Sequence, residues 1–556
     1  MNDWLVNRRA LMKCLMLAST APLVINSRAF ASSCDDHIVR LGAIIAPDTM
    51  NPFATWGASW PTIFTYDFLV GVDAQRHPDR KGFAKEWAVA DDSVTWTFKI
   101  WPGMKWSDGQ PATARDAAFT YNYLQGSIGK PDELNVGWNN TDGLNNIASI
   151  TAVDDETLQI VTKTPTRWPL DNTVSIVPEH IWNNISYADA RGTFRNDAPL
   201  VGTGPMIVSE FQQGQFARLT PNPYFRTGKP STAGAIFHFF NTADPIAQGL
   251  KSGDLDYGLS LTPAQWADLS TDNDIMVGQS RVEQRDFLAF NTASGKGEGS
   301  TRALQDQAFR DAIGYAIDQK MLVDRAYRGH ADPGVGMTMP VEKDYYSDLS
   351  DLRRRFDLAE AGRRLDAAGY RDTNGDGIRE DRDGKSLQLD LITGTLSGNL
   401  EMPLAVVQLI AGWLGQIGVP VSVTQLESGA LTARTAAPAD GGGGWDLLVT
   451  GSWWFSSPHN LFALGNGSLV GTGNRSYWTN TTFDALLSKV DATLDLKKRQ
   501  QLVDEAARLF YAEAPYIILA YPFVLEARRK DCFQGWGTED MLSTSAYFPL
   551  DRLRSS

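Results

Sequence analysis

The sequence contains few of the residue patterns on which enzyme chemistry usually depends. Its six histidines are scattered, and none forms the closely spaced pair that a zinc site needs. It has no Gly-x-Ser-x-Gly turn of a serine hydrolase and no phosphate-binding loop that ends in Lys-Ser or Lys-Thr. The glycine run at 441–444 lies in a polar stretch and predicts a flexible turn. The sequence therefore favours binding without a cofactor over catalysis, and a secreted hydrolase is the alternative from another class.

Long apolar runs and an excess of basic residues are also missing. Beyond the amino terminus, no stretch reaches the roughly 18 consecutive apolar residues that a membrane-spanning helix needs. Asp and Glu together number 65 against 51 Lys and Arg, which gives a net charge of −14. This charge argues against nucleic acid and against an anionic membrane surface as partners. The length of 556 residues predicts about three domains.

The first 31 residues have the order of a cleaved export signal. A basic segment with paired arginines at 7–13 precedes an apolar stretch from Cys14 to Ile25 that is too short to span a bilayer. Ala29-Phe30-Ala31 then supplies the small residues of a cleavage site. The paired arginines are typical of a twin-arginine signal, and an ordinary secretory signal is the alternative. We therefore expect the mature chain in the periplasm.

Cysteine is scarce, with three residues in the whole chain. Cys14 lies in the predicted signal, which leaves Cys34 and Cys532 near the two ends of the mature chain. In an oxidising compartment these two can form a disulfide that joins the termini. Two alternatives stay open: both are free buried thiols, or Cys34 carries a lipid. Residues 31–33, Ala-Ser-Ser, lack the leucine-like residue that a lipid-attachment motif usually has.

Strand-like and helical segments interleave along the chain, which predicts an α/β fold. The pattern predicts strands at 38–44, 95–100 and 206–210, and helices at 114–124, 308–326, 483–492 and 498–513. Thr113, with Asp116 three residues later, is typical of a helix N-cap with a capping box. In the segment 308–326, one helical face would hold Phe309, Ile313, Ala316, Ile317 and Met321.

A long motif connects the strand at 95–100 to the helix at 114–124. Residues 97–116 read TFKIWPGMKWSDGQPATARD and resemble the signature of the family 5 extracellular solute-binding proteins, the peptide, nickel and oligosaccharide receptors of ABC importers. Trp101 and Ala112 depart from that signature on a scaffold element. Shorter matches keep the family's order at 50–52, 202–205, 222–225, 290–292, 309–318, 367–370 and 514–517. The resemblance covers essentially the whole mature chain.

The resemblance implies a two-lobed periplasmic-binding-protein fold of the class II type, with an extra subdomain in the first lobe. The core of lobe I would take 34–71, 200–290 and 523–556, its extra subdomain 72–199, and lobe II 291–522. A Cys34–Cys532 disulfide would then join two pieces of lobe I. Hinge closure would hold a small solute, a short peptide in most of the family, between the lobes. The expected partners are the permease subunits of an ABC importer, and the chain itself is expected to be a monomer.

The stretch expected to contact the ligand departs from the peptide-binding members. Those members usually carry an Asp after a strand of lobe II, where it pairs with the amino group of a peptide. Here that position falls in GSWWFSSPHN at 451–460, and no Asp or Glu occurs between Leu447 and Phe483. Aromatic rings suit sugar rings or flat apolar groups, so an oligosaccharide or another neutral solute is the alternative ligand. A different acid, such as Asp286, is a further alternative.

The candidate ligand-binding residues are Asn51, Asn291, Thr450, Ser452, Trp453, Trp454 and Phe455. Some of these rings can instead belong to the core. In an extended chain, Trp453 and Trp454 would point to opposite faces, so one of them suffices to line the site.

A second motif lies at Asp372, Asn374 and Asp376, which begin like an EF-hand calcium loop. The twelfth position is Asp383 instead of Glu, and an alternating strand-like run follows where a helix is needed. We therefore expect a polar hairpin turn, in which Asn-Gly and Asp-Gly supply left-handed backbone. A weak calcium site stays the alternative.

Overall fold

The computed structural model describes most of the chain between Ile38 and Lys530, together with 533–534 and 554–555. Within this span it leaves out 45–46, 55–58, 73–77, 80–81, 137, 294–301, 343–344, 395, 398–399, 402–403, 437–442 and 454–461. The predicted signal, Cys34, Cys532, Trp454 and Phe455 therefore lie outside the described residues, as does the side chain of Trp453. Among the described helices, none combines the length and apolar composition that a membrane crossing requires.

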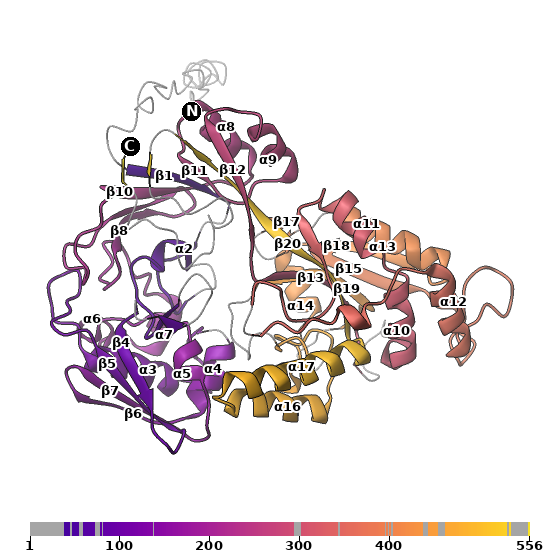
Figure 1. Cartoon of the computed structure of the whole chain (residues 1–556), viewed down its shortest axis with the longest axis horizontal. Coiled ribbons are helices and arrows are strands. Elements are labelled where there is room, and N and C mark those ends of the chain that lie inside the picture. The colour runs from indigo at the N-terminus through magenta and orange to yellow at the C-terminus, as the bar shows by residue number, and fades with distance from the viewer. Residues whose placement is uncertain are drawn as a thin grey trace, which may run out of the picture.

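A twelve-stranded sheet runs through both halves of the molecule (Figure 1). Its main path is β18 (Val421–Leu426), β15 (Leu389–Gly394), β19 (Leu447–Trp453), β13 (Gln284–Phe290), β20 (Tyr516–Arg529), β11 (Tyr257–Gly258), β1 (Ile38–Ala43), β10 (Gly234–Phe239), β9 (Phe216–Pro221) and β8 (Met206–Gln212). Two further strands, β12 (Ile275–Arg281) and β14 (Ala331–Pro333), also pair with β20. The mixed parallel and antiparallel pairing confirms the predicted α/β class.

β20 joins the two halves because each of its ends pairs in a different half. Tyr516–Ala520 pair with β13, whereas Phe523–Arg529 pair with β12. Between these segments stands Pro522, which has no amide hydrogen and so cannot continue the ladder on that side. The chain crosses a second time at 282–283, between β12 and β13.

We call the half that contains β1 and β8–β12 lobe I and the half that contains β13–β19 lobe II. β13 pairs with β19 and with the first part of β20, so it belongs to the sheet of lobe II. We therefore propose 282–283 and 521–522 as the two connections between the lobes, in place of the predicted border at 290–291.

The extra subdomain of lobe I has its own antiparallel sheet. This sheet follows the order β4 (Ala84–Val89), β5 (Thr95–Ile100), β7 (Thr157–Thr162) and β6 (Ile147–Asp154). Its helices are α3 (Ala114–Ser127), α4 (Trp138–Asn145), α5 (Trp168–Asp171), α6 (Glu179–Trp182) and α7 (Tyr187–Gly192). The predicted capping box of α3 is confirmed, because the Thr113 amide donates to Asp116 and the Thr113 hydroxyl accepts from the first turn. We refer to residues 82–199 as the subdomain.

The remaining helices cover the sheets of the two lobes (Figure 1). Lobe I has α2 (Ser59–Thr62), α8 (Asp244–Ser252) and α9 (Pro263–Leu269). Lobe II has α10 (Gln307–Tyr315), α11 (Gln319–Met321), α12 (Leu358–Ala367), α13 (Leu404–Gln416), α14 (Ser428–Arg434), α16 (Thr481–Ala492) and α17 (Leu496–Glu513). Short pairs are β2 (Gly71–Val72) with β3 (Pro78–Asp79), β16 (Leu396–Ser397) with β17 (Leu400–Glu401), and β21 (Phe533–Gln534) with β22 (Arg554–Ser555). In lobe II, one hydrophobic core lies under α10, α12 and α13, and another under α16 and α17.

The predicted single helix at 308–326 is wrong, because it is broken at 316–318. α10 ends at Tyr315, and the carboxylate of Asp318 accepts a hydrogen bond from the Met321 amide at 2.8 Å. This bond starts a new turn, α11, which continues as one turn of π-helix over Leu322–Ala326. Met321 consequently lies 39% exposed instead of on the buried face, whereas the other four predicted apolar positions are buried.

The motif at 202–205 is explained by a buried ion pair and by tight packing. Gly202 and Gly204 lie against the backbone carbonyls of Thr65 and Phe64, where no Cβ atom fits. Thr203 donates to Asp67 at 2.7 Å. Arg226 approaches the same carboxylate with two nitrogens, at 2.6 and 3.1 Å.

We expect Arg226→Met to lower the free energy of unfolding by about 3–5 kcal/mol, because it leaves the buried Asp67 carboxylate without its cation. The matched control is Arg115→Met, whose pair with Asp155 is exposed and should contribute little. Urea denaturation followed by tryptophan fluorescence measures both. Equal losses in the two variants would contradict a structural role for the Arg226 pair.

Candidate ligand site at the junction of the lobes

The predicted ligand stretch begins next to the connection between the lobes. In the antiparallel pair of β13 and β19, Gln284 lies opposite Trp453, Arg285 opposite Ser452, and Phe287 opposite Thr450. Because Gln284 directly follows the connection at 282–283, the end of β19 reaches this connection. Thr450 and Ser452 are buried on one face of the sheet, and Trp453 is the last residue of the strand.

The arginine beside Ser452 is the charge centre of this junction. The side chain of Arg285 is fully buried and donates to the carbonyl oxygen of Met337. Burial lowers the pKa of Arg285, and the nearby charges of Glu342 and Tyr521 oppose this shift. Glu342 is also buried, and its carboxylate accepts from the Met339 amide at 3.2 Å. A cation and an anion are therefore held together away from water, next to the predicted ligand stretch.

The segment that carries Met337 and Glu342 is fastened to β20. The hydroxyl of Tyr521 donates to the Gly336 carbonyl at 2.6 Å and lies within reach of the amides of Val335 and Gly336, at 3.3 and 3.2 Å. Gly334 packs directly against the backbone of Ile518, which leaves no room for a side chain. β20 thus fixes the segment that carries Met337 and Glu342 next to Arg285.

Two buried polar side chains at this junction, those of Gln284 and Ser452, are notable. Among the described residues, neither the amide oxygen and nitrogen of Gln284 nor the hydroxyl of Ser452 has a hydrogen-bond partner. Such groups destabilise the conformation that buries them. Gln284, Arg285 and Glu342 were not among the residues predicted from the sequence. The signal for Gln284 and Arg285 is the polar run Gln284-Arg285-Asp286 at the start of an otherwise apolar strand, whereas Glu342 has no comparable signal.

The acid suggested as a replacement, Asp286, faces the core of lobe II. It lies inside β13, is 1% exposed, and accepts from the Tyr327 hydroxyl at 2.5 Å. Burial raises the pKa of Tyr327 well above its ordinary value, and the Asp286 charge adds to this shift. Because the Asp286 carboxylate is engaged by Tyr327 in a core, this geometry gives no support to its pairing with a ligand amine.

The two predicted asparagines lie apart from Thr450 and Ser452, and their amides hold loops. Asn51 donates to the carbonyls of Ala190 and Phe194 at 2.6 and 2.7 Å and accepts from the Phe53 amide at 2.8 Å. Asn291 donates to the Trp445 carbonyl at 2.8 Å and accepts from the Ala293 amide at 3.1 Å. Both side chains are buried. These bonds indicate structural roles.

The Asp372 loop is a turn closed by its own backbone. The two carboxylate oxygens of Asp372 accept from the amides of Gly375 and Gly377 at 2.6 and 2.9 Å, and both glycines have positive φ. These bonds, that of Gly377 first, lower the pKa of Asp372. The acid that approaches Asp372 and Asp376 is Glu380, whereas Asp383 pairs with Arg302 at 3.3 Å. The geometry is that of the predicted hairpin turn, and the calcium alternative stays a prediction.

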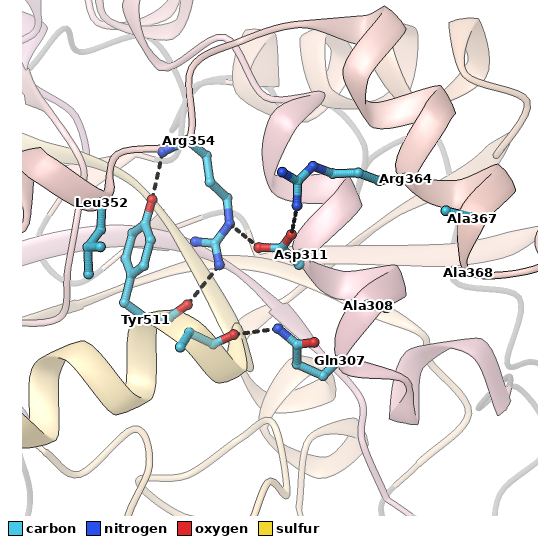
Figure 2. A pocket seen from close by; sticks show the side chains of 10 residues that line it. Gln307, Ala308, Asp311, Leu352, Arg354, Arg364, Ala367, Ala368 and Tyr511 are labelled. Atoms are coloured by element: carbon cyan, nitrogen blue, oxygen red, sulfur yellow. Dashed lines mark hydrogen bonds and ion pairs between the residues drawn. The ribbon is translucent and has the colours of Figure 1, made fainter.

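A pocket of about 600 Å³ lies on lobe II between α10, α12 and the end of α17 (Figure 2). Its carboxylate, Asp311, pairs with Arg354 and Arg364, each at 2.8 Å. The backbone amide of Arg354 also donates to the Tyr511 hydroxyl at 2.7 Å. The charged groups of this pocket are thus engaged with one another, and they tie three helices of lobe II together.

If Asn51 has a structural role, replacing it should lower the stability of the protein and leave its affinity for ligand unchanged. We expect Asn51→Ala to lower the free energy of unfolding by about 2–4 kcal/mol, because two buried carbonyls and one amide lose their partner. Asn184→Ala, at an exposed position, is the control and should change it by less than about 0.5 kcal/mol. Chemical denaturation together with a ligand titration checks both. A variant that is as stable as the control but binds ligand poorly would return Asn51 to the ligand site.

Comparison with known proteins agrees with this architecture. The model of the bacterial extracellular solute-binding proteins, family 5 middle, matches residues 80–472. The oligopeptide-binding protein AppA of Bacillus subtilis is 24% identical over 470 residues, which is 82% of this chain and 80% of that protein. The probable D,D-dipeptide-binding periplasmic protein DdpA of Escherichia coli is 23% identical over 534 residues, 92% of this chain and 93% of that protein.

Solved structures with the same fold hold different ligands. The Bacillus subtilis AppA complex with a nonapeptide has a TM-score of 0.76 at 20% identity, covering 93% of this chain and 98% of that one. NikZ from Campylobacter jejuni in complex with Ni(L-His) has a TM-score of 0.77 at 18% identity, covering 93% and 99%. The chain has the two-lobed fold of the periplasmic binding proteins, and it belongs to family 5 of the bacterial extracellular solute-binding proteins.

Proposed function

We propose that this chain is the solute-binding component of an ABC importer, which captures a short peptide or a related small solute between its lobes and delivers it to the permease. The observation that carries the proposal is the pair of connections at 282–283 and 521–522, with the predicted ligand stretch starting beside them. A strand that passes through both lobes supplies a hinge, and hinge closure suits capture of a solute. The peptide-binding names of its relatives support the same function.

The chain's own residues bear on the class of solute. No acid follows β19 before Phe483, and the charge of Glu342 is opposed by Arg285. A free amino group would therefore find little negative charge at its usual place. Trp453, Trp454 and Phe455 support the second candidate, an oligosaccharide or another neutral solute. The agropinic acid complex of AgaA and the Ni(L-His) complex of NikZ indicate that this fold accommodates unlike ligands.

The remaining parts of the proposal follow from the same reasoning. We propose a periplasmic monomer that carries its solute unchanged, in line with relatives that are named as binding proteins. Export through the twin-arginine-like signal and the state of Cys34 and Cys532 belong to this proposal. Recovery of the bound solute with unchanged mass after prolonged incubation would support binding, whereas turnover would favour the secreted hydrolase.

A pair of matched peptides tests how the solute is recognised. We expect a short peptide to raise the melting temperature of the mature chain by several degrees at about 100 times its Kd, which corresponds to about 2.7 kcal/mol. Because no acid stands at the usual amine position, the N-acetylated form of the same peptide should bind within about threefold. Differential scanning fluorimetry and calorimetric titration measure both.

The outcomes separate the alternatives. If acetylation abolishes binding, an acid elsewhere recognises the amine, and the neutral-site interpretation is wrong. If oligosaccharides stabilise the chain and peptides do not, the second candidate replaces the first. If neither class binds and the chain converts a substrate, the transport proposal fails.

A further inference from the structure

The lobes also meet on the side away from the hinge. There α4 and α5 of the subdomain approach the start of α17 and the end of α16, with α4 the nearer in this view (Figure 1). Leu494, in the connection between α16 and α17, belongs to lobe II in sequence. Its side chain nevertheless packs against the hydrophobic core of lobe I and its subdomain. An apolar residue of one lobe therefore rests on the core of the other.

Charged residues surround this apolar contact. In α5 and just before it, Asp171 and Arg167 pair at 3.2 Å, with 11% and 17% of their side chains exposed. Burial raises the pKa of Asp171, and the positive charges of Arg167 and Arg499 oppose this shift, whereas the negative charge of Asp491 adds to it. Arg499 and Asp491 belong to lobe II. Charges of the two lobes thus lie near enough to act on each other.

Tyr345, in another segment of lobe II, also lies at this contact between the lobes. Burial raises its pKa to about 12, and the negative charge of Asp171 adds to the shift. Its hydroxyl accepts a hydrogen bond from Arg499 at 3.2 Å. The interface therefore joins three parts of the sequence: α5, the segment around Tyr345, and the α16–α17 connection.

Arg499 makes fewer hydrogen bonds with the described residues than its guanidinium group can donate. It is fully buried, and its Nε donates to the Thr493 carbonyl at 2.9 Å. Among the described residues, its Nη2 has no hydrogen-bond partner. A buried guanidinium with a nitrogen to spare favours a nearby anion, and the charge of Asp171 in lobe I interacts with that of Arg499.

We propose that α5 and the α16–α17 connection form a latch, which holds the two lobes together on the side opposite the hinge. The subdomain supplies the lobe I half, Arg167 and Asp171. Lobe II supplies the other half: Leu494, Arg499, Asp491 and Tyr345. Opening would expose Leu494 and hydrate the four charges. The role of the latch in solute exchange rests on the proposed function, but the latch itself is testable without any solute.

The apolar contact made by Leu494 is the simplest part of the latch to test with one substitution. Leu494→Glu places a charge on the partly buried contact between the lobes, and this charge is better solvated when they separate. Leu496→Glu is the matched control, because Leu496 lies two residues on and is 38% exposed. Leu494 precedes α17 and Leu496 is its first residue, so neither change removes a residue from the buried face of the helix. We therefore expect both variants to fold, which circular dichroism and urea denaturation check.

The distance between the lobes is the readout. Fluorophores are placed on the mature full chain by Asp91→Cys in the subdomain and Lys385→Cys in lobe II, with Cys34 and Cys532 replaced by serine. In single-molecule energy transfer without solute, we expect Leu494→Glu to shift the ratio of closed to open molecules by about 5- to 100-fold towards open. Leu496→Glu should leave the ratio within about twofold.

A double-mutant cycle tests the charges. Asp171→Asn and Arg499→Gln should each shift the ratio towards open, and the double variant should shift it by less than the product of the two. The proposal is overturned if Leu494→Glu behaves like Leu496→Glu, or if the starting chain is mostly open. These measurements need no solute. A solute screen in which nothing binds would therefore contradict the proposed function without contradicting the latch proposal.

Discussion

The pairing of β20 with strands of both lobes is the constraint on which the rest of this structure depends. Its first segment is held by β13 and its second by β12, and Tyr521 and Pro522 between them pair with β14 on the other side. On the side of β13 and β12 the ladder therefore has a gap at Pro522, which cannot donate a hydrogen bond. The same strand also presents Tyr521, which positions the segment around Arg285. β20 therefore contributes both to the connection between the lobes and to the candidate site.

The local parts of the fold could be predicted from the sequence because short-range chemistry decides them. The capping box of α3 needs only Thr113 and Asp116, three residues apart. The departure at Trp101 is accommodated by a partner 19 residues away, since its indole donates to the Gly82 carbonyl at 3.1 Å. The break at 316–318 was missed because apolar periodicity continues through it. The competing signal, Asp318 as a cap, is a single residue within an otherwise helical apolar pattern.

The candidate site was harder to predict, because it depends on register between distant strands. Arg285 and Ser452 become neighbours only through the pairing of β13 with β19, and Glu342 approaches from a third segment. Asn51 and Asn291 illustrate another difficulty, and their role as ligand residues stays a prediction. Their motifs are prominent, but the amides serve loops of the scaffold. A family motif marks what the fold requires, and such residues need not touch the ligand.

Hinge and latch together suggest how closure can be reversible. At the hinge, the buried Gln284 amide and Ser452 hydroxyl find no hydrogen-bond partner within the described part of the chain, which disfavours the conformation that buries them. At the latch, the apolar contact of Leu494 favours closed lobes. The free energy that desolvates Asp171 and Arg499 is about as large as the free energy of their attraction, so the charges change this balance little. The two effects oppose each other, so the free-energy difference between closed and open lobes should be small. A solute that contacts both lobes can then shift this balance by its differential affinity alone, and a permease can reverse it.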